Sequence, residues 1–373
     1  MEFLNVFLKE SGTQGYGMLA FGVLALAWGC LLAVRTARVR RKPAVRDEKV
    51  EGGVSVIITS HNSAEQLEEN LPYFLTQDCD DYEVIVVDEC SEDDTESVLG
   101  RLEEKFSRLR SAMVPRDAKF RSTKKLAINI GVLSARHDIL LFSEANCRPV
   151  SPGWVREMRA SLGKKNSVAV GFANYEAGEA SGRLRLFRAV RFMRMLTGDG
   201  KGGKMGGDGC NMAYRKSDYL ANRGFRDSQF YIGYDSDVVR DLAKFGPVAV
   251  TKSADAYVRM GRNRYKSGGE IAYRCACDMR RPWKERVAAS GCQTLRVLFY
   301  AAGIWLVCAG AWPLIVGGVL ALFLLLEFLL LSFCLRHLRQ RRLWLSSLMA
   351  VTVGVFYVWG VNARVFFGRK RWR

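Results

Sequence analysis

Apolar residues in the central part of the chain form short runs, separated by segments whose apolar residues have helical spacing. The runs are rich in β-branched and aliphatic residues and predict strands buried on both faces, at 54–59, 82–87 and 138–143. The segments with helical spacing predict helices at 64–75, 91–106 and 124–134, the second of them with Ser91 as its N-cap. Strands that alternate with helices in this way predict an α/β domain with a mostly parallel sheet and flanking helices.

Each predicted strand is followed directly by polar residues. Thr59, His61 and Asn62 close the first strand, Asp88 and Ser91 follow the second, and Glu144 and Asn146 follow the third. A single aspartate in such a place is more often a helix cap than a ligand. Three polar strand ends in succession favour a binding crevice, because the carboxyl ends of parallel strands meet at one edge of the sheet. We expect a nucleotide to bind there, with Asp88 accepting hydrogen bonds from its base or ribose.

A longer apolar segment lies near the N-terminus. Residues 16–34 carry no charge and are long enough to cross a bilayer, and five basic residues follow between Arg35 and Lys42. The positive-inside rule then places the N-terminus outside and the rest of the chain in the cytoplasm. A cleaved signal peptide is disfavoured, because its basic residues would precede the apolar run and no small-residue cleavage site stands out.

The C-terminal part of the chain is also strongly apolar. Residues 297–335 contain one charge, Glu327, and predict two membrane spans that turn near Pro313. Basic residues then mark a cytoplasmic loop before a last apolar stretch at 343–361. If that stretch crosses the membrane, the basic tail after Arg364 lies outside, against the positive-inside rule. Whether it spans, re-enters or lies in the interface stays open, and so does the number of spans, three or four.

The chain of 373 residues has a net charge of +18, which favours an anionic partner. The basic residues cluster beside the apolar segments and in the helix expected at 182–197, and the sequence contains no nucleic-acid-binding motif. We therefore expect anionic membrane lipid and phosphorylated substrates as partners, and no nucleic acid. The five arginines of the 182–197 helix suggest either contact with an anionic membrane surface or a solvated surface helix.

The ten cysteines are scattered along the chain. Cys275 and Cys277 form a close pair that is only weak evidence for a metal site. Reduced thiols in a cytoplasmic domain are the simpler interpretation.

Residues 53–285 resemble the glycosyltransferase family 2 enzymes, which have the Rossmann-like GT-A fold. The resemblance rests on four segments that occur in the family's order and spacing: VSVIITSHN from Val54, VVDECSEDDT from Val86, KKLAINIG from Lys124 and ILLFSEANCRP from Ile139. The membrane-anchored pattern is similar to that of bacterial members that work at the inner face of the plasma membrane.

The resemblance implies a site for a nucleotide-sugar donor, UDP- or GDP-linked. Asp88 would bind the nucleoside, with Thr59, His61, Asn62 and Ser91 around the donor, and Lys124 or Lys125 would lie near its phosphates. Glu144 and Asn146 occupy the place of the family's D-x-D, which binds Mg²⁺ or Mn²⁺ and the diphosphate. Arg281 is a further candidate for a diphosphate clamp, since a guanidinium can partly replace a metal.

On the acceptor side, the resemblance implies that Asp235 is the general base of an inverting transfer. Gly209 and Asn211 belong to a glycine-rich segment, Asp237 follows the base, and Trp283 lies in a loose counterpart of the family's Q-x-x-R-W. The chain departs from the family at Glu144-Ala-Asn146, where the amide replaces a carboxylate and metal affinity should fall. An alternative is therefore a catalytically silent nucleotide-sugar-binding subunit of a polysaccharide assembly complex.

These observations predict four parts of the chain. Residues 1–35 form a transmembrane anchor, 36–52 a basic juxtamembrane linker, 53–290 a cytoplasmic GT-A domain, and 291–373 a C-terminal membrane region. The expected protein is a multi-pass enzyme of the bacterial inner membrane, a hexosyltransferase in cell-envelope glycan synthesis. Its acceptor would be lipid-linked or a polysaccharide.

Overall fold

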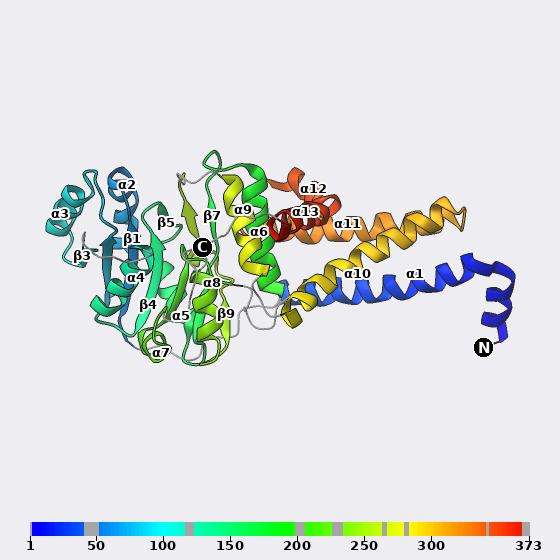
Figure 1. Ribbon diagram of the computed structural model, residues 1–373, viewed down its shortest axis with the longest axis horizontal. Helices are drawn as coiled ribbons and strands as arrows, with labels where there is room; N and C mark the ends of the chain where they lie inside the picture. The colour runs from blue at the N-terminus through cyan, green and yellow to red at the C-terminus, as the bar shows by residue number, and fades with distance from the viewer. Residues whose placement is uncertain are drawn as a thin grey trace. The chain divides into compact units, whose positions relative to one another are not determined.

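The computed structural model describes residues 2–40, 52–115, 123–197, 206–225, 234–262, 267–279, 283–340 and 343–367. The chain divides into two compact units, each described here by itself (Figure 1). The α/β unit comprises residues 43–196, 201–280 and 361–373, and the helical unit comprises residues 1–42, 197–200 and 281–360.

A seven-stranded sheet forms the centre of the α/β unit, in the order β3-β2-β1-β4-β8-β6-β9. Its strands are β1 (Val54–Ser60), β2 (Tyr82–Asp88), β3 (Leu109–Met113), β4 (Ile139–Glu144), β6 (Val168–Val170), β8 (Met212–Arg215) and β9 (Val248–Val250). The first four named in the order are parallel, whereas β8 runs antiparallel to both β4 and β6. The mostly parallel sheet predicted from the apolar runs is confirmed, and β3 was not anticipated.

The register brings the polar strand ends to one edge. Ser60 pairs with Asp88 across β1 and β2, and Thr59 pairs with Glu144 across β1 and β4. A second sheet of three strands follows, β5 (Cys147–Pro149), β10 (Val258–Met260) and β7 (Ala173–Tyr175), in the order β5-β10-β7. Because β5 begins directly after β4, the end of the large sheet continues into the small one.

Helices cover both faces of the large sheet. On one face, α2 (Ala64–Leu75) buries Leu67, Leu71 and Phe74 in the same apolar core as Val56 and Ile58 of β1. The same core includes residues of α3 (Thr95–Lys105) and α5 (Trp154–Leu162). On the other face, α4 (Thr123–Ser134) packs on β1 and β2. It passes so close that a Cβ on Gly131 would lie 2.6 Å from Cγ2 of Ile57. Glycine thus allows the helix to approach the strand.

The helix after β2 begins later than predicted. We expected it to start with Ser91 as its N-cap, but α3 starts at Thr95 with Asp94 at the cap position. The Ser91 hydroxyl donates instead to the carboxylate of Asp88. The prediction of the cap was wrong because a local bond back to the strand end competes with capping.

Most of the basic helix α6 (Gly182–Thr197) is buried or half-buried, although Arg183 in its first turn is exposed. Arg185, Arg188 and Arg191 are less than a tenth exposed, and each bonds within the α/β unit. Both predicted roles of these three arginines, contact with anionic lipid and solvation, are therefore wrong. The remaining helices of the unit are α7 (Lys216–Ala221), η2 (Ala254–Ala256), α8 (Tyr234–Leu242) and α9 (Ser267–Met279).

Among the described residues of the helical unit, three helices are long and apolar enough to cross a membrane. The candidate spans are Gly12–Arg40 in α1 (Glu2–Arg40), Gly291–Cys308 in α10 (Trp283–Cys308) and Pro313–His337, which is α11. The predicted turn near Pro313 is observed, and residues 36–40 of the predicted linker continue α1. The last apolar stretch forms two short helices, α12 (Trp344–Thr352) and α13 (Gly354–Phe367), with a bend of 66° between them.

The single charge inside the predicted spans, Glu327 on α11, is buried within the helical unit. Its carboxylate accepts hydrogen bonds from the Trp28 indole at 2.8 Å and the Tyr300 hydroxyl at 3.0 Å, and forms an ion pair with Arg296 at 2.8 Å. The guanidinium of Arg296 also donates to the carbonyl of Val351. These bonds link α1, α10, α11 and α12.

Candidate functional site

The loops that follow β1 and β2 are bonded to each other at the edge of the sheet. The backbone N–H of Asn62 donates to the Ser91 hydroxyl at 2.8 Å, and Oδ1 of Asn62 accepts from the Glu92 N–H at 2.7 Å. Asn62 has a positive φ of 48°, a conformation that asparagine tolerates better than most residues. A ring nitrogen of His61 lies 2.9 Å from the carbonyl oxygen of Glu89. The structure therefore brings His61, Asn62 and Ser91 together, as the sequence analysis expected.

Asp88 lies at the centre of this edge and is 2% exposed. One carboxylate oxygen accepts the backbone N–H of Ser91 at 2.9 Å, and the other accepts the Ser91 hydroxyl. Between them, Cys90 has the left-handed φ of 59° that this tight turn requires. In the free protein Asp88 thus organises its own loop, and each oxygen retains a lone pair for a further donor.

The third strand end differs chemically from the other two. Glu144 forms an ion pair with Lys124 of α4 at 2.6 Å. Asn146 is buried, and its Oδ1 lies 3.4 Å from the Cys147 thiol that donates to it. The intervening carbonyl of Ala145 accepts from the Asn70 amide at 3.1 Å.

These residues do not form a site for a divalent cation on their own. Glu144 supplies one carboxylate, already paired with a lysine, and Asn146 supplies one neutral oxygen. Among the described residues, no group of three or more His, Cys, Asp or Glu side chains could hold a metal ion. A hard cation such as Mg²⁺ or Mn²⁺ prefers several oxygen ligands of negative charge, so the donor set fits it poorly.

Asp235 is a buried carboxylate in the first turn of α8. Its oxygens accept backbone N–H groups from Ser236 at 2.8 Å and from Gly209 at 3.3 Å. Burial raises the pKa of Asp235 above its usual value, and the positive charge of Arg274 and the two N–H groups oppose that rise only in part. A carboxylate with a raised pKa is a better proton acceptor than an ordinary aspartate.

The glycine-rich segment before β8 holds Asp235 and also meets the third strand end. The carbonyl of Cys210 accepts a hydrogen bond from Ser143 of β4 at 3.0 Å. Gly207 packs so tightly that a Cβ there would lie 2.7 Å from the carbonyl oxygen of Asp235. The residue before Glu144 and the carboxylate of Asp235 are therefore connected through two adjacent residues of one loop, Gly209 and Cys210.

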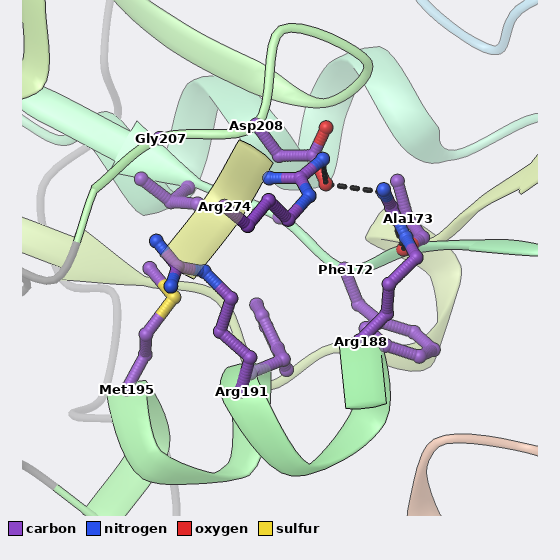
Figure 2. A pocket seen from close by; sticks show the side chains of 11 residues that line it. Phe172, Ala173, Arg188, Arg191, Met195, Gly207, Asp208 and Arg274 are labelled. Carbon is purple, nitrogen blue, oxygen red and sulfur yellow. Dashed lines mark hydrogen bonds and ion pairs between the residues drawn. The ribbon is translucent and has the colours of Figure 1, made fainter. Parts of the chain in front are cut away.

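Sequence reasoning missed a buried network of charged residues behind this loop. Asp208 forms ion pairs with Arg188 of α6 and with Arg274 of α9, and Glu270 pairs with the same two arginines. Figure 2 shows Arg188 and Arg274 pointing toward Asp208 from their different elements. We call Arg188, Asp208, Glu270 and Arg274 the ion network.

Charge balance keeps the acids of this network ionised. Burial alone would raise the pKa of Glu270, but Arg188 and Arg274 lower it to about 2. Burial would also raise the pKa of the partly buried Asp208, but the same two arginines hold that pKa below its usual value. The spacing of arginines on α6 was the only signal in the sequence, and it did not identify their partners.

Two further residues predicted for the site, Lys125 and Asp237, lie near each other. Lys125 of α4 faces Asp237 of α8, and burial lowers the pKa of Lys125 although Asp237 opposes this. Asp237 also pairs with Arg240 at 2.6 Å. The donor-side lysine and the acceptor-side aspartate therefore share one region.

Asn211 is fully buried and makes structural bonds. Its amide donates to the carbonyls of Phe172 and Ala256, and its oxygen accepts from the indole of Trp154. We expect it to support the acceptor side through the fold and not by direct contact. Arg281 lies outside the described residues, and of Trp283 only the backbone, at the start of α10, is described.

Comparison with known proteins identifies the family that part of this chain matches. Residues 55–220 match the sequence model of the family described as "Glycosyl transferase family 2". A search of curated protein sequences finds no significant match.

Among solved structures, the chain is similar to the mannosyltransferase PcManGT from Pyrobaculum calidifontis in complex with GDP-Man and Mn²⁺. The TM-score is 0.56 at 15% identity, over 94% of this chain and 100% of that chain. It also matches S. aureus TarS 1–349, with a TM-score of 0.43 at 14% identity, over 81% of this chain and 92% of that chain. At 15% identity the likeness to PcManGT concerns the fold alone, and the family match ends before Asp235. Residues 55–220 form a glycosyltransferase family 2 domain, and the chain is a glycosyltransferase with the GT-A fold.

Proposed function

We propose that this glycosyltransferase moves a sugar from a UDP- or GDP-linked donor to a lipid-linked or polysaccharide acceptor, with inversion at the anomeric carbon. The reaction takes place at the inner face of the bacterial plasma membrane and serves cell-envelope glycan synthesis. The α/β unit is cytoplasmic, and α1, α10 and α11 cross the membrane. The relative in complex with GDP-Man supports a nucleotide-sugar donor through the shared fold.

One observation carries this proposal: a buried carboxylate is held beside the donor edge. The backbone N–H of Gly209 bonds to Asp235, and the next residue, Cys210, bonds to Ser143 beside Glu144. An acceptor hydroxyl that attacks the sugar must lose a proton, and a carboxylate with a raised pKa is suited to accept it. Asp235 is the general base in this proposal.

The donor binds along the edge formed by β1, β2 and β4. Asp88 accepts from the nucleoside, while Thr59, His61, Asn62 and Ser91 surround it. Lys124 and Lys125 face the diphosphate and stabilise the charge that develops as the nucleotide departs. Lys124 turns from Glu144 to the phosphates when the donor is bound, because a dianionic diphosphate is the stronger partner.

Mg²⁺ or Mn²⁺ would arrive with the donor, its charge stabilising the leaving group when bound. Glu144 and Asn146 fit such an ion poorly, so we assign no step to it. Gly209, Asn211 and Asp237 support the acceptor side, and Trp283 and Arg281 are assigned from the sequence alone.

The test is transfer or hydrolysis of radiolabelled UDP- and GDP-sugars by the full-length protein in detergent, beside Asp235→Asn. Asp255→Asn, at an exposed aspartate of η2, is the matched control. We expect turnover in the parent and the control and a loss of at least 100-fold in Asp235→Asn. Donor binding, followed by the shift in melting temperature, should survive in Asp235→Asn and fail in Asp88→Ala. Full turnover by Asp235→Asn would overturn the assignment of the base.

The second candidate, a silent nucleotide-sugar-binding subunit, is favoured by the ion pair between Lys124 and Glu144. That pair places a cation where the family's metal site requires carboxylates. Donor binding by the parent without turnover of any UDP- or GDP-sugar would support this candidate.

A further inference from the structure

The last two helices, α12 and α13, form a bent pair. A separate observation indicates on which side of the membrane each end of the pair lies. In the sequence, α12 is preceded by the end of α11 and a basic segment, which together include Arg336, Arg339, Arg341 and Arg342. The chain runs from the α/β unit into α10, and α10 and α11 each cross the membrane once in the function proposed above. The segment after α11 then lies on the side of the membrane from which α10 starts. The bent pair therefore begins on that side.

The far end of the pair returns to the same side. Residues from Val361 onward belong to the α/β unit, and Val361 packs against that unit's hydrophobic core. A residue packed in this core cannot lie beyond the opposite face of the bilayer. The tail from Arg364 to Arg373 is rich in lysine and arginine, which also favours the cytoplasmic side.

The dimensions of the pair fit a shallow arch. With 9 and 14 residues, α12 and α13 are about 13 Å and 21 Å long, and the hydrocarbon core is about 30 Å thick. If both tilt equally, a bend of 66° inclines each by about 33° to the membrane plane. The bend would then lie about 7–11 Å deeper than the ends, the depth at which interfacial helices bind.

Contacts within the helical unit support that depth. Arg296 donates to the carbonyl of Val351, one residue before the end of α12. Arg296 lies five residues after the start of the candidate span at Gly291, or about 8 Å along the helix axis. The bend of the arch is thus held near the end of that span at which Gly291 lies.

The outward surface of the arch is apolar and aromatic. Its exposed large residues are Trp344, Leu345, Leu348, Met349, Val353, Phe356, Tyr357 and Trp359. Aromatic side chains of this kind are typical of the boundary between headgroups and acyl chains, and basic segments lie on both sides in the sequence. Anionic phospholipid matches both features.

We propose that α12 and α13 form a membrane-embedded arch that enters and leaves the bilayer on the side of the α/β unit and binds anionic phospholipid there. The chain then crosses the membrane three times. This inference is independent of the reaction proposed above, because it uses no residue of the donor edge or of Asp235.

The test compares the two ends of the arch in right-side-out and inverted membrane vesicles. One full-length variant carries an epitope tag between Gln340 and Leu343, and a second carries it after Arg373. Tags at Lys164–Lys165, in a turn of the α/β unit, and at 309–312, between α10 and α11, report the two sides. We expect protease to remove both arch tags from the same side as the Lys164–Lys165 tag. Removal of the tag after Arg373 from the side of the 309–312 tag would overturn the arch.

A second measurement tests the lipid. The untagged protein is reconstituted with a photoactivatable phosphatidylglycerol, and adducts are mapped by mass spectrometry. We expect adducts on residues 344–359. Adducts on α11 but not on the arch, or cross-links of the arch to a second copy of the chain, would overturn the lipid assignment.

Discussion

The backbone N–H of Gly209 lies 3.3 Å from Oδ2 of Asp235. Because Gly209 follows Asp208 of the ion network, this bond connects the general base proposed here to two buried arginines. The position of Asp235 therefore depends on Gly209, and its charge depends on the nearby ion network.

The charge of Arg274 should set the acid limb of the pH–rate profile. The rate falls as pH decreases through the raised pKa of Asp235, because the protonated base cannot accept a proton. Arg274→Gln removes a neighbouring positive charge and should move this limb to higher pH by about one unit. Arg185→Gln, at a buried arginine bonded to the Tyr175 carbonyl, is the control and should leave the limb in place. A limb that does not move in Arg274→Gln would contradict the electrostatic role.

A methyl group at Gly207 should displace Asp235. The new Cβ would meet the Asp235 carbonyl oxygen at 2.7 Å and Cγ2 of Val239 at 2.8 Å, and the first of these is a backbone atom. We expect Gly207→Ala to lower kcat by about tenfold or more with little change in donor affinity. In Gly100→Ala on α3 the methyl group meets no atom within 4 Å, so activity should be unchanged. Equal kcat in the two variants would show that the close packing of Gly207 against Asp235 does not affect the reaction.

A carboxylate at position 146 should improve the metal response. Asn146→Asp adds a second negative ligand beside Glu144, so we expect the Mn²⁺ concentration for half-maximal activity to fall about tenfold. The parent should respond only at millimolar concentrations, as measured by Mn²⁺ titration of activity after removal of metal with EDTA. Asn166→Asp, near the end of α5, controls for the added charge and should behave as the parent does. If the Mn²⁺ concentration for half-maximal activity is unchanged in Asn146→Asp, any bound metal does not contact residue 146.

Removing Glu327 should destabilise the helical unit strongly. Glu327→Ala leaves Arg296 buried without its carboxylate, which costs about 3–5 kcal/mol in comparable buried pairs. The double variant Arg296→Met, Glu327→Leu should regain most of that loss, since neither charge remains. Denaturant unfolding in mixed micelles would measure both. A double variant as unstable as Glu327→Ala would mean that the bonds to Trp28 and Tyr300 dominate.

The sequence predicted the parts of the fold that depend on local patterns. Runs such as Val84–Val87 are apolar at every position, and this one lies within β2, a central strand of the sheet. Because parallel strands share one carboxyl edge, the approximate position of Asp88 and Glu144 also followed from the order of strands. The start of α3 did not follow, since Ser91 can bond either forward as a cap or back to Asp88.

The ion network could not be predicted from the sequence. Helical spacing on α6 identifies which arginines share a face, but their partners Asp208 and Glu270 come from a distant loop and from α9. Such pairing depends on how the elements pack in three dimensions. For the same reason, the basic helix was expected on a surface, whereas Arg188 and Arg191 pair with acidic residues inside the domain.

The bonds between the loops after β1 and β2 have a consequence for recognition. Asn62 and Ser91 are already joined before any ligand arrives, so little conformational entropy is lost when a nucleotide binds. Loops that are held together in this way distinguish nucleobases by their shape, since the loops do not rearrange around a base that fits poorly. The enzyme should therefore accept one nucleobase and reject others, even where their sugars and phosphates are identical.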